Sequence, residues 1–98
     1  MKIVNLEDYQ IQAETLKVLA HPTRLEILYL LESHPQLSVT QMKESLGCDQ
    51  THASQHLKQM KLRGILGSKR SGKFMLYFLR QKSCGELVKV IETINQDH

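Results

Sequence analysis

Five polar side chains lie close together in the middle of the sequence, and all of them can hydrogen bond to the edges of nucleotide bases. They are Gln50, Thr51, His52, Ser54 and Gln55. A glutamine amide can make two hydrogen bonds to adenine, and Ser and Thr hydroxyls can pair with several bases. The alternative interpretation is that these residues form the solvent-facing side of an ordinary helix. Residue types alone leave both interpretations open.

Positive charge is concentrated in one third of the chain. Residues 50–82 contain eight basic side chains and no acidic one. Residues 1–49 have four basic and seven acidic side chains, a net charge of −3, and residues 83–98 have one and three, a net charge of −2. Eight like charges repel one another unless they meet a polyanion, and nucleic acid is the usual one. The side chains expected to contact phosphates are Lys58, Lys61, Lys69, Arg70 and Lys73.

Four histidine and cysteine side chains could bind a metal or react with an oxidant. His52 and His56 are four positions apart, the spacing of a metal-binding pair on a helix. They lie within the polar segment, however, which favours base contact or packing over metal binding. Cys48 and Cys84 are 36 positions apart and do not indicate a disulfide framework. We expect Cys48 to pack as a small apolar residue, and Cys84, near the start of a helix that could stabilise a thiolate, to be the candidate thiol sensor.

The first third of the chain predicts two helices and a short extended segment. Apolar residues recur every three or four positions, as on one side of a helix: Leu6, Tyr9, Ala13, Leu16 and Ala20. His21-Pro22 ends this helix, and Pro22 suits the first turn of the next one. The second helix is apolar on nearly all sides, which predicts the central core helix, and it ends at His34-Pro35. Residues 37–39 form a short extended piece.

The middle of the chain predicts two helices joined by a tight turn. The first spans about residues 40–46 and stops at Gly47, and Asp49 is a strong N-cap for the second, which continues to about residue 63. The second helix has one apolar stripe, made of Ala53, Leu57 and Met60. This arrangement matches a helix-turn-helix, in which the N-terminal side chains of the second helix reach base edges in the major groove. The five polar residues occupy that end of the helix.

The last third predicts a β-hairpin and a final helix. Residues 65–66 and 74–79 are β-prone, and Ser71-Gly72 is a turn signal between them, which gives the hairpin a basic tip. Ser83 followed by Glu86 has the spacing of a capping box and predicts a helix over about residues 83–95. Its apolar residues have helical spacing: Leu87, Val90, Ile91 and Ile94.

The predicted fold is therefore mainly α-helical, with about five helices and a two-stranded hairpin. A winged helix-turn-helix has the same order of elements: helix, helix, short strand, helix, helix, hairpin and helix. We expect residues 1–98 to form one such domain, because the chain has the length of a single domain and no repeat or linker interrupts it.

Three blocks of the sequence resemble the ArsR family of prokaryotic repressors. Residues 16–28 (LKVLAHPTRLEIL) are similar to its opening signature, and residues 45–57 (SLGCDQTHASQHL) to the signature of its recognition helix. Gly72-Lys73, together with Tyr77 and Leu79, resembles its wing. The blocks occur in the family's order and cover most of residues 16–79.

The resemblance implies a homodimer joined through the first and last helices, over residues 6–20 and 83–95. Such a pairing would bury apolar side chains that exceed the needs of a small monomer's core: Leu6, Tyr9, Ala13, Val90, Ile91 and Ile94. It also implies a repressor that a signal releases from a palindromic operator in double-stranded DNA, because a two-fold dimer reads a two-fold site.

The sequence departs from the family at its familiar metal sites. Many members carry two cysteines in a CxC motif at the start of the third helix, and the matching positions here are Ser38 and Thr40, which are poor ligands for soft metals. Other members use histidines on the last helix, where this chain has none before His98. We therefore predict no metal and no other cofactor, and the signal remains unidentified.

The sequence disfavours enzymes and membrane proteins. It contains no glycine-rich phosphate loop, no HExxH motif, and no Ser or Cys with an evident base. The residues up to Leu6 resemble no secretory leader, and the apolar stretches are too short to cross a bilayer, so we expect a cytoplasmic protein. The favoured function is sequence-specific DNA binding in transcription regulation. The alternative is a winged-helix module for protein–protein contact, which leaves the eight positive charges unexplained.

Overall fold

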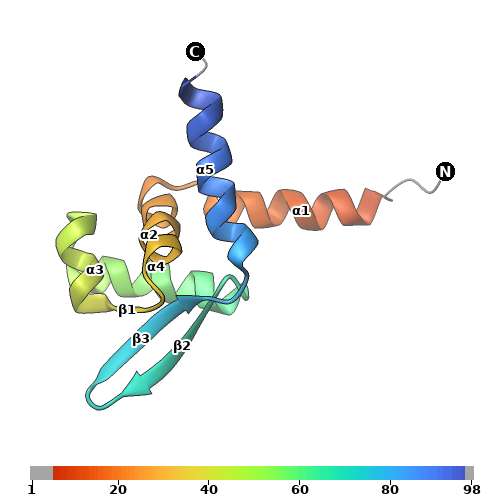
Figure 1. Cartoon of the computed structure of the whole chain (residues 1–98). Helices are drawn as coiled ribbons and strands as arrows, with labels where there is room; N and C mark the ends of the chain where they lie inside the picture. Colours follow the sequence, from red (N-terminus) through yellow and green to blue (C-terminus); the bar gives the residue numbers. More distant parts are fainter. Residues whose placement is uncertain (1–5, 97–98) are drawn as a thin grey trace.

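Five helices and three strands make up the computed structural model, which describes residues 6–96 (Figure 1). Residues 1–5 and 97–98 lie outside this description. They include most of the N-terminal segment that was compared with a secretory leader, and His98. The elements are α1 (Leu6–Leu19), α2 (Pro22–Ser33), β1 (Leu37–Ser38), α3 (Val39–Leu46), α4 (Gln50–Leu62), β2 (Leu66–Ser71), β3 (Phe74–Leu79) and α5 (Lys82–Gln96). Each predicted element is present.

The core is built around α2, as its apolar composition predicts. Ile27 and Leu28 are fully buried and Leu31 nearly so, whereas Tyr29 is half exposed. Pro22 lies in the first turn of α2, where its missing N–H costs no hydrogen bond, and His21 caps the helix by accepting from the backbone N–H of Thr23. The other core residues come from the elements that surround α2, namely α1, α3, α4, the hairpin and α5: Leu19, Met42, Leu57, Met60, Ile65, Leu66, Tyr77 and Val88.

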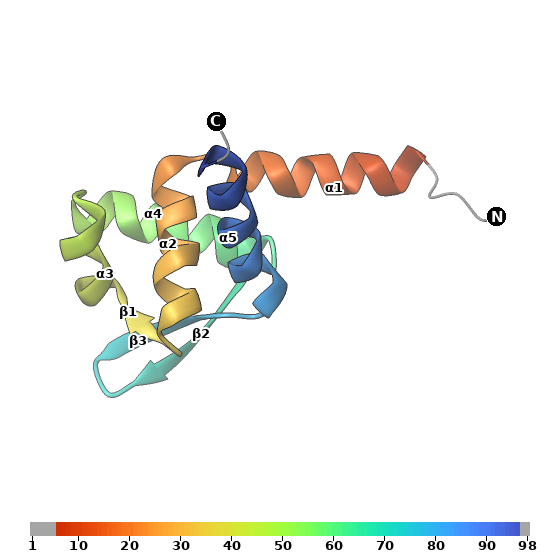
Figure 2. The same cartoon turned by 45° about the horizontal axis from the view of Figure 1, so that its top comes forward.

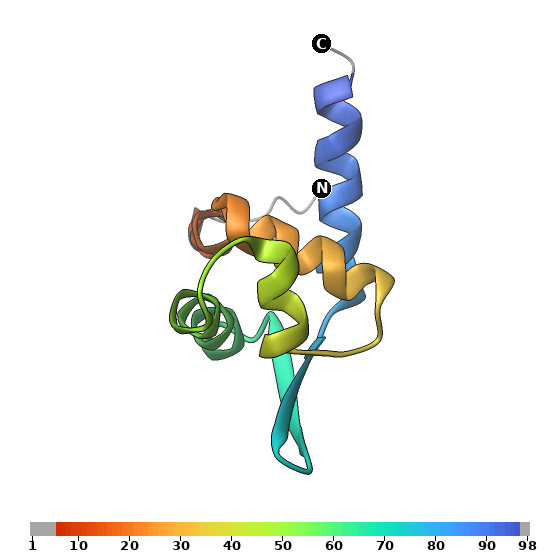
Figure 3. The same ribbon diagram turned by 90° about the vertical axis from the view of Figure 1, so that its left-hand side faces the viewer.

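The hairpin projects from one end of the helical body (Figures 1 and 3). β2 and β3 are antiparallel, with Ser71 opposite Phe74 and Leu66 opposite Leu79. The short extended segment is a third strand, because β1 pairs with β3 through Leu37 opposite Tyr77. The strand order β1-β3-β2 fixes the base of the hairpin against the body and leaves its tip free.

Helix α5 packs closely across α2. Gly85 is buried, and a Cβ atom there would lie 2.8 Å from Cγ of Glu32, so a larger residue would require neighbouring side chains to shift. Lys89 and Glu32 form an ion pair of 2.8 Å across the same contact, and that hydrogen bond raises the pKa of Lys89. The predicted capping box at Ser83 and Glu86 is wrong, because the helix begins at Lys82 and Ser83 lies inside its first turn.

Helix α1 extends sideways from the body (Figure 2), which gives the molecule its long dimension of 52 Å. Leu19 is its only buried residue, and it lies outside the predicted apolar stripe. The stripe itself is exposed to solvent along its length, at Leu6, Tyr9, Ala13, Leu16 and Ala20. The spacing predicts the helix correctly, but the stripe is not buried in its own chain.

Candidate DNA-binding surface

The turn between α3 and α4 is held by local hydrogen bonds. Ser38 and Gln41 form a capping box at the start of α3, in which each side chain accepts from the other residue's backbone N–H. Gly47 ends α3 with φ = 65°, a left-handed conformation that favours glycine. Asp49 caps α4, as predicted, by accepting from the backbone N–H of His52 at 2.8 Å. These contacts fix where α4 begins and therefore which residues form its first two turns.

One side of α4 is buried and the opposite side is exposed. The predicted stripe of Ala53, Leu57 and Met60 is fully buried against the core. On the other side, a shallow hollow of about 490 Å³ is lined by Gln50, Thr51, Ser54, Gln55 and Lys58. Four of the five predicted base-reading side chains therefore share one face with a predicted phosphate ligand, since positions three and four apart lie together on a helix.

The fifth predicted base-reading residue, His52, does not line this hollow. Its ring Nδ1 lies 2.9 Å from Oδ1 of Asp49, on an exposed part of the turn. The backbone and ring of His52 together hold the pKa of the Asp49 carboxyl below its ordinary value. His52 remains accessible at the helix end, but its side chain already contacts the cap.

The predicted phosphate ligands are all exposed. Lys58 and Lys61 lie on α4, and Lys69 and Arg70 lie on β2. Lys73 lies in the turn at the hairpin tip, and its Nζ is 5.4 Å from the centre of the Phe74 ring. Lys69 and Arg70 are neighbours on a strand, so their side chains point to opposite faces of the hairpin. The positive charge is thus divided between the exposed part of α4 and both faces of the wing.

The candidate metal and thiol residues have other contacts. Nδ1 of His56 accepts a hydrogen bond from Arg24 and its ring packs against His21, whereas Nδ1 of His52 contacts Asp49. Within residues 6–96, no three His, Cys, Asp or Glu side chains are grouped closely enough to hold a metal ion. Cys48 and Cys84 are free and half-buried. The predicted stabilisation of a Cys84 thiolate is wrong, because burial raises the pKa of that thiol.

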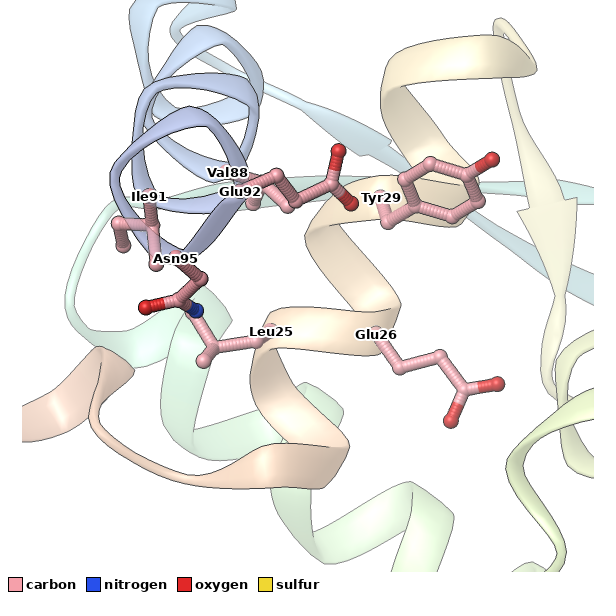
Figure 4. Close-up of a pocket in the computed structure, with 7 residues that line it drawn as sticks. All are labelled: Leu25, Glu26, Tyr29, Val88, Ile91, Glu92 and Asn95. Carbon is pink, nitrogen blue, oxygen red and sulfur yellow. The ribbon is translucent and has the colours of Figure 1, made fainter. Parts of the chain in front are cut away.

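A second hollow, of about 350 Å³, lies between α2 and α5 (Figure 4). Residues of both helices line it: Leu25, Glu26, Tyr29, Val88, Ile91, Glu92 and Asn95. Asn95 of α5 reaches toward Leu25 of α2, whereas Glu26 points away from α5. The lining of the hollow is mainly apolar, with two carboxylates and no basic side chain, and carboxylates repel phosphate. This side of the molecule is therefore unsuited to nucleic acid, in contrast to the surface formed by α4 and the wing.

A helix-turn-helix followed by a β-hairpin wing defines the class of winged helix-turn-helix proteins, and comparison with known proteins gives the same class. A helix-turn-helix domain model matches residues 19–66. The transcriptional repressor PagR of Bacillus anthracis is 36% identical over 95 residues, which cover 96% of this chain and 91% of PagR. The regulator YgaV of Escherichia coli is 28% identical, covering 84% and 83%.

Solved structures agree with these sequence relatives. The crystal structure of PagR superposes with a TM-score of 0.76 at 32% identity, covering 89% of this chain and 99% of PagR. That of Rv0081 from Mycobacterium tuberculosis gives 0.81 at 30% identity, covering 91% and 89%. A homodimeric winged helix-turn-helix domain from Mycobacterium bovis, described as a possible ArsR-family regulator, gives 0.79 at 24% identity and shares the fold.

The chain belongs to the ArsR family of winged helix-turn-helix regulators, as its three sequence blocks predict. It is a DNA-binding regulator of transcription. The predicted fold class is confirmed, with the short β1 strand as an addition. Within the described residues, none of the helices has the length and apolar composition that a membrane span requires.

Proposed function

We propose that this chain is a homodimeric repressor that reads a palindromic operator with α4 and grips the flanking phosphates with α4 and the wing. The observation that carries the proposal is the shared face of Gln50, Thr51, Ser54, Gln55 and Lys58 on a helix whose start is fixed by its cap. Groups that hydrogen bond to bases lie there beside one that neutralises phosphate. A relative named as a transcriptional repressor, PagR, supports repression rather than activation.

The proposed dimer accounts for the exposed apolar side chains of α1 and α5. Leu6 is 71% exposed, Tyr9 51%, Val90 55% and Ile94 53%, while Ile91 is half-buried beside α2. Exposed large apolar side chains on two helices are typical of an interaction surface. In a two-fold dimer the helices of one protomer would cover those of its partner, and the two α4 helices would contact half-sites about 34–36 Å apart, which is one turn of DNA.

Base reading is tested by substituting one residue of the hollow. Gln55→Ala should reduce the preference for a selected operator over random DNA by about 1–3 kcal/mol per half-site, because each protomer loses one bidentate contact while phosphate contacts remain. Gln59→Ala is the matched control, since Gln59 lies on the same helix outside the hollow. Binding of both variants to operator and random duplexes would be titrated at one salt concentration.

Equal losses on both duplexes would show that Gln55 does not read bases. Association with DNA that is weak and insensitive to salt would instead favour the alternative, a winged-helix module for protein contact.

The signal that would release the operator is unidentified, and Cys84 is the thiol on which we propose an oxidant would act. It lies in a groove between α1 and α5, beside Leu16 and Leu87, where the oxygen of a sulfenic acid, or a second thiol joined to it as a mixed disulfide, would crowd the two helices. Because burial raises its pKa, less thiolate is present at neutral pH than for an ordinary cysteine. In a Cys48→Ser background, iodoacetamide should therefore modify Cys84 more slowly at pH 7 than it modifies a free thiol. Modification as fast as that of a low-pKa thiol would contradict the burial argument.

A further inference from the structure

The recognition helix α4 is joined to the end of α1 by one guanidinium group. Nε of Arg24, on α2, donates to Nδ1 of His56 on α4 at 3.1 Å. Nη1 of the same side chain donates to the backbone carbonyl of Val18 at 2.9 Å. Val18 is in the last turn of α1, where carbonyls lack partners within the helix. The axes of α1 and α4 are nearly parallel, with opposite chain directions, both lying across Figure 1 and nearly end-on in Figure 3.

His21 completes the cluster. Its ring packs against that of His56, with centroids 4.4 Å apart and planes inclined by 54°. Its Nδ1 also accepts from the N–H of Thr23 as the cap of α2. Two imidazoles and a guanidinium therefore lie together where α1, α2 and α4 meet. A second contact between α4 and α1, Arg63 to Glu14 at 3.9 Å, is exposed, and such ion pairs contribute little.

The Arg24–His56 hydrogen bond exists in only one protonation state of the imidazole. An arginine Nε–H is always a donor, so Nδ1 of His56 must offer a lone pair, which requires the neutral ring protonated at Nε2. A proton on Nδ1 would place donor against donor and add a positive charge beside the guanidinium. The contact is then lost.

We propose that the Arg24–His56 contact positions the recognition helix relative to α1, and that protonation of His56 releases it, so that discrimination between operator and other DNA falls in mild acid. This inference rests on the proposed operator binding by α4 and on α1 as part of the dimer. Arg24 and His56 are positioning residues, because His56 lies outside the hollow that faces DNA.

The electrostatic surroundings of His56 give the direction of the effect. Burial of the ring, and then the charges of His21 at the helix junction, Arg24 on α2 and His52 on α4, lower the pKa of His56 below its ordinary 6.5. A group with a lowered pKa in the folded state keeps its contact above the ordinary value and loses it as the pH falls. The contact is therefore complete at pH 7.5 and weakens progressively below about pH 6.5.

The test is the ratio of affinities for a selected operator and for random DNA, measured at pH 7.5 and at pH 5. The ratio is used because protonation of any histidine strengthens binding to all duplexes alike. The wild-type ratio should fall at pH 5 toward the ratio of His56→Ala, whose side chain cannot accept from Arg24 at either pH. His56→Asn should keep a high ratio at both values, since the amide oxygen can accept from Arg24 and does not titrate. His56→Ala should give a low ratio at both.

Controls separate His56 from the other histidines. His52→Asn, whatever its basal affinity, should retain the pH-dependent fall, and so should His34→Asn, which alters a histidine at the end of α2. The same fall in His56→Asn as in the wild type, or a wild-type ratio that does not change with pH, would overturn the proposal.

The titration of His56 can also be measured directly in the wild-type protein, which requires neither folded variants nor operator binding. Nitrogen chemical shifts of the His56 ring should identify Nδ1 as an acceptor at pH 7.5 and give a midpoint below 6.5. A midpoint at or above 6.5 would overturn the inference by itself. Absence of operator binding at pH 7.5, with the expected ring titration, would instead contradict the proposed function and leave the contact intact.

Discussion

Replacing Ile94 with Glu should separate the proposed dimer into monomers and weaken operator binding by at least about 100-fold. Ile94 is 53% exposed in the single chain, so the substitution leaves the core of the protomer unchanged. In a two-fold interface it would place two carboxylates in apolar surroundings, at a cost of several kcal/mol each. Each 1.4 kcal/mol corresponds to a tenfold change in association. Sedimentation equilibrium at micromolar concentration gives the oligomeric state, and titration of a two-half-site duplex gives the affinity.

Thr93→Glu is the matched control for this experiment. It adds the same charge to the same helix at an exposed position, on the side that carries Lys89 rather than the apolar residues. It should remain dimeric, with a melting temperature close to that of the wild type. A wild-type chain that sediments as a monomer, or Ile94→Glu that remains a dimer, would show that α5 does not form the interface.

Elements whose ends are set by neighbouring residues could be predicted from the sequence. Pro22 at the start of α2, Gly47 at the end of α3 and Asp49 at the start of α4 act through contacts within a few positions. The shared face of Gln50, Thr51, Ser54 and Gln55 follows from those boundaries and from the helical period. Most of the candidate site was thus predictable once the helix start was known.

Contacts between distant parts of the chain could not be predicted in this way. Arg24 and His56 are 32 positions apart, and residue types give no indication that a guanidinium and an imidazole will meet. The pairing of β1 with β3 and the burial of Cys84 between α1 and α5 likewise depend on tertiary packing. The helix-start argument for a stabilised Cys84 thiolate failed for this reason, because desolvation depends on neighbours that spacing does not reveal.

The apolar stripe of α1 shows a related ambiguity. Helical spacing at Leu6, Tyr9 and Ala13 predicts a helix with one apolar side, but it does not say whether that side meets the core of the same chain or a partner. In the structure the stripe is exposed, and Leu19 at the end of the helix makes the contact with the core. A sequence pattern of this kind predicts the helix, whereas the oligomeric state has to be measured.

Removing the basic side chains of the wing should weaken binding to every duplex and reduce its salt dependence. Each phosphate contact contributes about 0.9 to the slope of log K against log salt. If Lys73 and one of the two strand residues, Lys69 or Arg70, contact a phosphate in both protomers, the triple Ala variant should have a slope shallower by about 4. All three are exposed, so the fold should persist. Titrations at several salt concentrations, with operator and with random DNA, measure the slope.

Single substitutions then assign the contacts to the faces of the hairpin. Lys69 and Arg70 point to opposite faces, so a wing that lies with one face on DNA should show a slope change of about 2 per dimer for only one of them. Lys17→Ala is the matched control, because Lys17 is an exposed lysine on α1, outside the basic region. A triple variant with the wild-type slope would remove the wing from the interface. Phosphate contact would then rest on Lys58 and Lys61, whose substitution should reduce the slope in its place.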